Sequence, residues 1–244
     1  MRYQKVFFRT AVFLILFLSA CGQSTSPIIT DDICAPPCWN GIIPGKTTEP
    51  ELRSILDQLS IIDPESVVVS DQEPLFNHTY IVTLEKGRIL VFINFLDNVV
   101  SLILFTPLDI IGDDLGITFG EAVEAFGEPE FVVNTTTMGP TKFLWFNVGI
   151  NPWTLISAMH LQKGIEYHYR IPLLSKHPSQ QIEPDTRLLE ASFFDPAAFE
   201  QLADKRMFSG MNFEQTAERM YPWAGYGDIE SKYPYIPFSY VMPE

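Results

Sequence analysis

The short motifs that identify many enzymes are missing from this 244-residue chain. It contains no G-x-S-x-G nucleophile elbow, no P-loop, no H-E-x-x-H and no G-x-G-x-x-G dinucleotide loop. Its close pairs of acids, at 113–114 and at 128 and 130, stand beside expected helix ends. A glycosidase-type carboxylate pair stays open, because such carboxylates converge in space and not in sequence. The sequence therefore predicts no catalytic residue.

Histidine is also scarce, with four residues in the chain. His78 and His177 have polar or proline-flanked neighbours and are expected at the surface. His160 and His168 flank a Lys-Gly turn, and a two-residue hairpin there would pair His160 with Tyr167. The two imidazoles would then lie on opposite faces of a sheet and could not share a metal ion. We therefore expect neither a metal nor a cofactor.

The N-terminal apolar stretch is too short to cross a membrane. Three basic residues precede an apolar run at 11–18, whereas about 20 residues are needed to span roughly 30 Å of hydrocarbon. This is the anatomy of a signal peptide, over residues 1–20. The run ends in the sequence LSAC, which resembles the bacterial lipoprotein box and implies lipidation of Cys21. An ordinary secretory signal that happens to end at a cysteine is the alternative.

Basic residues are few as well. The 16 lysines and arginines are outnumbered by 30 acids, so the net charge is −14. This balance repels nucleic acid and anionic headgroups, and we expect no nucleic-acid partner.

Residues 21–33 begin with small polar residues and predict a flexible tether. Lipid chains contribute about 0.8 kcal/mol per buried CH₂, so we expect a lipid anchor on the extracytoplasmic side of a cell membrane.

Three cysteines leave two for the mature chain, Cys34 and Cys38, in the sequence CAPPC. Outside the cytoplasm such a pair is most simply a disulfide, and the two prolines would hold a turn that brings the Cα atoms within about 6 Å. Haem attachment is excluded because no C-x-x-C-H is present. A copper or redox site is the alternative, although copper would need a nearby histidine or methionine ligand.

Two helix starts with the same spacing organise the rest of the chain. At 45–56 and again at 116–126, a glycine stands two residues before a threonine, and apolar residues follow the threonine by five and eight positions. This pattern is typical of an N-cap followed by one helical face. Thr118 and Glu121 form a capping box, and Gly127 with Pro129 would end the second helix.

Each helix is followed by strand-like sequence, rich in β-branched and aromatic residues with short polar breaks. The pattern predicts an α+β fold of two tandem helix-plus-antiparallel-sheet units, over residues 34–110 and 111–183. The expected strands are 80–84, 89–95 and 99–105 in the first unit, and 131–133, 142–148, 154–161 and 165–171 in the second.

Residues 184–244 predict helices followed by an extended arm. Asp195 and Pro196 resemble an N-cap with proline at the first helical position, and a second helix is expected from 212 to 221. Prolines forbid regular pairing in the aromatic stretch that follows. Rigid aromatic rings are common at interfaces. The candidate binding residues are Trp223, Tyr226, Tyr233 and Tyr235; the alternative is an arm packed across the sheets of its own domain, whose rings bind nothing.

The sequences IIPGKTTEPELRSIL and LGITFGEAVEAFGEPEFVV resemble the small outer-membrane lipoproteins of the SmpA/OmlA type and the tandem β-lactamase-inhibitor-protein-like fold. In that group an element with G-x-T, a glutamate and a final G-x-P precedes each small antiparallel sheet; the first copy here lacks the final G-x-P. The resemblance implies a non-enzymatic envelope module that binds another envelope or secreted protein or acts as a scaffold. A secreted hydrolase or glycan-binding protein, with its site between the two units, is the alternative.

Cys21→Ser should release the protein from the membrane fraction, because serine offers no thiol for the lipid. Fractionation followed by immunoblotting measures this. A variant with serine at both 34 and 38 is the control, and it should stay with the membrane. Retention of Cys21→Ser in the membrane fraction would refute the anchor.

Overall fold

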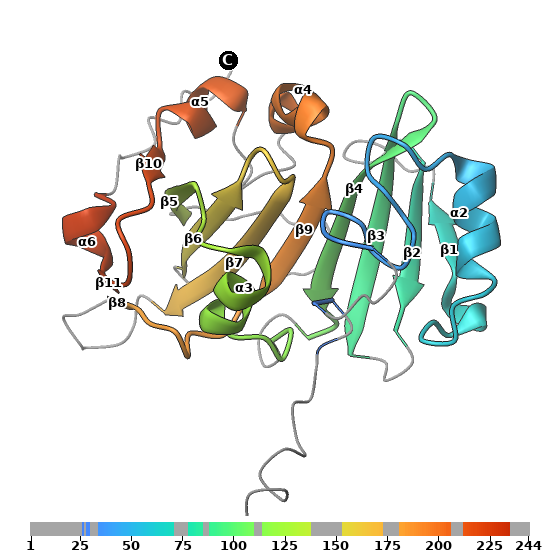
Figure 1. The fold of residues 1–244 in the computed structure, drawn as a ribbon, viewed down its shortest axis with the longest axis horizontal. Helices are drawn as coiled ribbons and strands as arrows, with labels where there is room; N and C mark the ends of the chain where they lie inside the picture. The colour runs from blue at the N-terminus through green and yellow to red at the C-terminus, as the bar shows by residue number, and fades with distance from the viewer. Residues whose placement is uncertain are drawn as a thin grey trace, which may run out of the picture.

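The structure is a computed structural model that describes residues 26, 28–29, 34–70, 78–84, 88–109, 114–137, 153–172, 181–205 and 212–234. These ranges contain short helices and a large antiparallel sheet (Figure 1), so the predicted α+β class is confirmed. Within them, no helix has the length and apolar character needed to cross a membrane.

Among the described residues, nine strands form the main sheet. In spatial order they are β1 (Val68–Ser70), β2 (Thr79–Thr83), β3 (Ile89–Leu96), β4 (Val99–Pro107), β9 (Glu190–Phe194), β7 (Ile165–Pro172), β6 (Trp153–His160), β5 (Phe131–Thr137) and β10 (Met220–Pro222). Every neighbouring pair is antiparallel. Two further strands, β8 (Gln181–Ile182) and β11 (Gly227–Asp228), pair with each other.

The first half of the chain follows its prediction closely. Helix α2 (Glu49–Leu56) has Thr48 as its N-cap, one residue after Thr47, the threonine of the predicted spacing. The Glu51 carboxylate accepts a hydrogen bond from Thr48 N at 2.8 Å. Its buried residues, Leu52 and Leu56, face the sheet. Strands β2 to β4 confirm the predicted three-stranded meander. Strand β1, which follows the 3₁₀ turn η1 (Pro64–Ser66), is not foreseen by the sequence pattern.

The second helix, α3 (Phe119–Phe126), also confirms its prediction. Thr118 Oγ1 accepts a hydrogen bond from Glu121 N at 3.2 Å, and the Glu121 carboxylate accepts one from Thr118 N at 2.7 Å. Gly127 ends the helix with a φ of 88°, which glycine adopts without strain. The strands β5, β6 and β7 follow as expected. The predicted strand at 142–148 lies outside the described residues.

The hairpin between β6 and β7 differs from its prediction. Residues 161–164 form a four-residue loop, so His160 pairs with Ile165, and the expected pairing of His160 with Tyr167 is wrong. The loop is held against β9, because the carbonyl of Gly164 accepts a hydrogen bond from Phe194 N at 2.8 Å. The pairing shifts by an even number of residues, so positions 160 and 168 still lie on opposite faces.

The sequence predicts only helices and an extended arm in residues 184–244. Strand β9, at Glu190–Phe194, shows that this prediction is wrong for the start of the segment. It pairs with β4 on one side and with β7 on the other, and so joins the two halves into one sheet. Four of its five residues are buried, on both faces: Ala191, Ser192, Phe193 and Phe194. A short strand buried on both faces shows no alternation of polar and apolar residues, so the sequence does not reveal it.

The remaining C-terminal elements are short. Asp195 caps the 3₁₀ turn η2 (Pro196–Ala198) by accepting a hydrogen bond from Ala197 N at 3.0 Å, and α4 (Phe199–Asp204) follows, as predicted. Helix α5 (Phe213–Ala217) begins at the expected N-cap but ends before 221, because the chain becomes β10 and pairs with β5. Helix α6 (Ile229–Lys232) follows β11.

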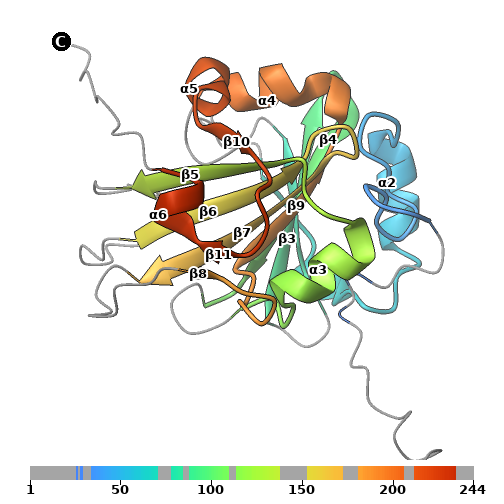
Figure 2. The same ribbon diagram turned by 60° about the vertical axis from the view of Figure 1, so that its left-hand side comes forward.

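The two faces of the sheet are covered by different helices (Figure 2). Helices α2 and α3 lie on one face, over a core that includes Val82, Ile103 and Phe193. We call this the α2/α3 face. Helix α4 packs on the opposite face, the α4 face, against residues such as Leu102 and Met159.

The two halves have the same order of elements along the chain, but their arrangements in space have opposite handedness. Strands β4 and β7 are both antiparallel to β9, so they run parallel to each other. The first half approaches β9 in the order β2-β3-β4 and the second in the order β5-β6-β7 from the opposite side, yet both helices lie on one face. A rotation that placed β2 to β4 on β5 to β7, with the strand directions kept, would turn the sheet over. It would therefore move α2 to the face opposite α3. The halves therefore cannot be superposed by rotation.

Gly164→Ala should destabilise the protein far more than Gly116→Ala. Both glycines have positive φ, +67° and +71°, so each alanine carries backbone strain of about 1–2 kcal/mol. A Cβ at 164 would also overlap the Phe194 carbonyl, whereas one at 116 meets nothing within 4 Å. Urea titration should show a difference in unfolding free energy of more than about 2 kcal/mol. Equal losses would contradict the packing of this loop on β9.

Candidate functional site

The C-terminal aromatic residues form a cluster over α3. Trp223 stacks on Phe119 with 5.4 Å between ring centroids and on Tyr233 with 6.2 Å, and Tyr226 meets Trp223 edge-on at 5.5 Å. Tyr233 has no exposed surface, Trp223 is half-buried and Tyr226 is 36% exposed. Tyr233 is therefore a core residue and not a binding residue. Tyr235 lies outside the described residues.

Hydrogen bonds fix the loop that carries this cluster. The Lys232 ammonium donates to the carbonyl of Ala224 at 2.9 Å and to that of Tyr226. The Tyr233 hydroxyl accepts a hydrogen bond from Ala224 N at 2.9 Å, and the Tyr233 carbonyl accepts one from the buried Asn134 side chain at 2.8 Å. The C-terminal segment is thus packed on its own sheet as far as α6, which matches the alternative stated for the arm.

A buried histidine and a buried tyrosine lie below α3. His160 is 1% exposed and Tyr167 has no exposed surface, with 6.0 Å between their ring centroids. Burial, and then the charge of Lys163, lower the pKa of His160 to about 4, so the imidazole is neutral at pH 7. Burial also raises the pKa of Tyr167. Within the described part of the chain, His160 Nε2 and Tyr167 Oη have no hydrogen-bond partner. The pair is closed to solvent and does not reach a substrate.

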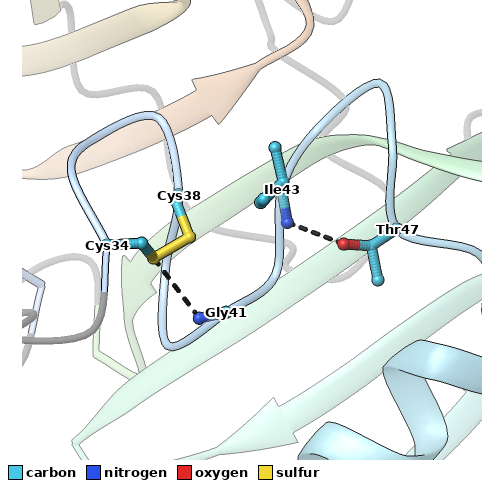
Figure 3. Close-up of a disulfide and its surroundings, with 5 residues drawn as sticks. All are labelled: Cys34, Cys38, Gly41, Ile43 and Thr47. Carbon is cyan, nitrogen blue, oxygen red and sulfur yellow. Dashed lines mark hydrogen bonds between the residues drawn. A yellow bond between two sulfur atoms is a disulfide. The ribbon is translucent and has the colours of Figure 1, made fainter.

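Cys34 and Cys38 are joined as a disulfide, with their Cα atoms 5.7 Å apart. Two hydrogen bonds shape the loop that follows (Figure 3): Gly41 N donates to Cys34 Sγ at 3.4 Å, and Ile43 N donates to Thr47 Oγ1 at 2.8 Å. The prediction of a short cross-linked turn thus agrees with the geometry.

The residue after this disulfide enters the core. Trp39 has no exposed surface and meets Phe105 of β4 edge-on at 5.2 Å. Its backbone pairs with Ile42 in both directions, at 2.9 and 2.8 Å. The cross-linked turn therefore positions an anchor of the α2/α3 core. The other predicted cysteine site, Cys21, lies outside the described residues.

A polar seam crosses the α4 face where β9 joins the halves. Glu166 on β7 is 1% exposed and accepts hydrogen bonds from the hydroxyls of Ser157 and Ser192, the latter at 3.4 Å. Next to it, the Thr106 hydroxyl donates to Glu190 at 3.2 Å. Glu166 is closed to solvent, whereas Glu190 at the other end of the seam is partly exposed. In the described ranges, no three His, Cys, Asp or Glu residues are placed to hold a metal ion.

Four polar side chains converge at the start of α2, in a cluster that sequence reasoning missed. Glu49 Oε1 accepts hydrogen bonds from Tyr80 Oη and Arg53 Nη2, both at 2.6 Å, and His78 Nε2 lies 3.0 Å away. The Tyr80 bond, followed by those of Arg53 and His78, lowers the pKa of Glu49 to about 2. Burial and the bond to Glu49 raise the pKa of Tyr80 to about 12. The charged carboxylate ties α2 to β2.

Apolar side chains remain exposed where the sheet ends at β1. Val68 is 53% and Val69 is 41% exposed. Ile81, Phe92 and Leu104 stand in register with Val68 across β2, β3 and β4, and each is partly exposed on the α4 face. We call the four residues that share the α4 face, Val68, Ile81, Phe92 and Leu104, the edge surface; Val69 is exposed on the opposite face. Contiguous apolar exposure of this kind marks interaction surfaces. The valine run at 67–69 was the only sequence signal for it.

Comparisons with known proteins leave the family open. No family model matches the chain, and no solved structure matches it. Elongation factor 2 of Korarchaeum cryptofilum is 29% identical over 126 residues, which are 49% of this chain and 17% of that protein. The chain therefore spans less than a fifth of that relative, and the similarity carries no role over to the edge surface or to the aromatic cluster.

The buried His160 should make the protein less stable as the pH falls. Its pKa is about 4 in the folded state and 6.5 in the reference state, so the unfolded chain binds the proton first. Between pH 7.5 and 5 the free energy of unfolding should fall by about 2 kcal/mol from this group. Urea titrations across that range should show a flatter dependence for His160→Leu. An unchanged pH dependence in the variant would contradict a buried neutral imidazole.

Proposed function

We propose that this protein is a lipid-anchored extracytoplasmic module that binds another envelope or secreted protein. The edge surface is the observation that carries the proposal. Its four apolar side chains lie side by side on β1 to β4, on one face, and end at the outermost strand. Buried apolar area is the main favourable term in most protein association, so such a surface favours a protein partner.

The sequence supports the location in the proposal. A short apolar run after three basic residues ends at Cys21, and a stretch of small polar residues follows it. The tether would hold the folded part away from the lipid and leave both sheet edges accessible. The excess of 30 acids over 16 basic residues disfavours binding to anionic membranes or nucleic acid.

The proposal includes two helix-plus-sheet units as building blocks. Helix α2 with β2 to β4 forms the first unit, and α3 with β5 to β7 forms the second. Strand β9 lies between them and pairs with both. A rigid sheet that is continuous across both units would hold the edge surface in a fixed geometry, which favours binding to a preformed partner surface.

A glycan-binding role is the second candidate, and Trp223 and Tyr226 favour it. Trp223 is half-buried and Tyr226 is 36% exposed. Aromatic rings with one face exposed to solvent can stack on a sugar ring. A hydrolase between the units has less support, because the two acids of the polar seam are held by hydroxyl groups: Glu166, which is only 1% exposed, by Ser157 and Ser192, and Glu190 by Thr106.

Val68→Asp should abolish capture of the partner, because the new charge would have to be buried at the contact. Leu108→Asp is the matched control: Leu108 is 56% exposed, close to the 53% of Val68, and lies outside the edge surface. Affinity purification from the native envelope compares the wild type with both variants. A partner lost equally from both, or from neither, would argue against the edge surface.

A further inference from the structure

The direction of the backbone groups in β1 follows from those of β2. Leu84 N donates to Ile89 O at 3.1 Å, so the Leu84 backbone faces β3. Backbone groups alternate in direction along a strand, so Thr83 must face the other way, toward β1. It does, because its carbonyl accepts a hydrogen bond from Asp63 N at 3.2 Å. Residues 79, 81 and 83 therefore present their N–H and C=O groups to β1.

The register then identifies which residue of β1 faces outward. Val68 pairs with Ile81 and Ser70 pairs with Thr79, so these β1 residues use their backbone groups to bond β2. Val69 stands opposite Tyr80, whose backbone groups face β3. The N–H and C=O groups of Val69 therefore point away from the sheet, in the direction that a further strand would occupy.

The side chains of β1 leave that direction open. Val68 and Val69 are exposed on opposite faces, and β1 carries neither lysine nor proline, the residues with which edge strands commonly avoid pairing. The opposite edge of the sheet is different, because β10 ends in Pro222, which has no N–H to donate. The two edges are thus unequal, and β1 is the one suited to receive a strand.

The charges near β1 indicate the partner. Exposed acids stand at Asp57 after α2 and at Asp63 and Glu65 beside η1, just before β1. Glu49 of α2, with its pKa of about 2, is fully charged at pH 7. The exposed Arg53 is one opposing cation, and it is already bonded to Glu49 at 2.6 Å. An incoming strand therefore meets a negative surrounding and is favoured if it carries lysine or arginine.

We propose that β1 accepts an extended, basic segment of a partner protein as an added antiparallel or parallel strand, with the Val69 N–H and C=O as its backbone contacts. Strand addition of this kind draws affinity from main-chain hydrogen bonds. A second copy of this chain is the wrong occupant, because two bodies of net charge −14 repel each other. The inference rests on the proposed protein-binding function and specifies its partner.

The test uses the full lipidated protein in neutral detergent micelles and a fluorescent peptide of alternating valine and lysine. Fluorescence anisotropy should show binding that weakens with added salt. The same peptide with glutamate in place of lysine should bind at least about tenfold more weakly. Equal binding of the two peptides would overturn the choice of a basic partner.

Val69→Pro removes an outward N–H that does not bond β2, so it should weaken binding of the basic peptide about tenfold or more. Val69→Thr keeps the N–H and the branched shape and should bind like the wild type. Val69→Lys is a second variant that keeps the backbone but adds a repelling charge, and it should also weaken binding. Urea midpoints report whether each variant is folded. Unchanged binding by folded Val69→Pro or Val69→Lys would overturn the inference.

Sedimentation velocity tests whether a second copy of this chain, and not a basic segment, occupies the edge at β1. Self-association of the wild type that disappears in Val69→Pro would show that a second copy covers β1, and it would overturn the basic-segment proposal. Failure of the proposed function has another signature, because envelope capture would then be unaffected by Val68→Asp whether or not the basic peptide binds.

Discussion

The pairing of β9 with both β4 and β7 is the constraint on which the rest of the structure depends. The ring centroid of Phe193 in β9 lies 5.5 Å from that of Phe105 and 5.9 Å from that of Phe126. This one ring therefore links the cores of the two halves. On the other face, Phe194 supplies the core under α4 and Ser192 bonds the buried Glu166. Burial of each phenylalanine contributes roughly 2–3 kcal/mol. Without β9, two open half-sheets would expose apolar edges.

The common sequence pattern of the two helix starts has a local explanation. Thr48 and Thr118 each form a capping box with a glutamate three residues later, and this chemistry fixes where a helix begins whatever surrounds it. The opposite hand of the two halves shows that the same local signals serve two different arrangements around β9. Order along the chain and arrangement in space are therefore separate properties of this fold.

Accessibility separates the candidate sites from one another. The His160–Tyr167 pair and Glu166 of the polar seam are closed to solvent and act within the fold. The Glu49 cluster has its carboxylate occupied by three donors and joins a helix to a strand. The edge surface and Tyr226 of the aromatic cluster remain partly exposed. Physical access, more than the chemical type of the residues, thus directs the proposed function toward association.

The sequence alone determined the local features: the capping box of Thr118 and Glu121, the meander of β2 to β4, and the short distance between Cys34 and Cys38. Each depends on residues close together in the chain, as capping, alternation and tight turns do. Tertiary structure alone decided the position of β9, the burial of Tyr233 and the outward direction of Val69. These depend on contacts between distant residues, such as Tyr80 with Glu49 or Asn134 with Tyr233, and a local pattern carries no record of which distant segment will pair with it.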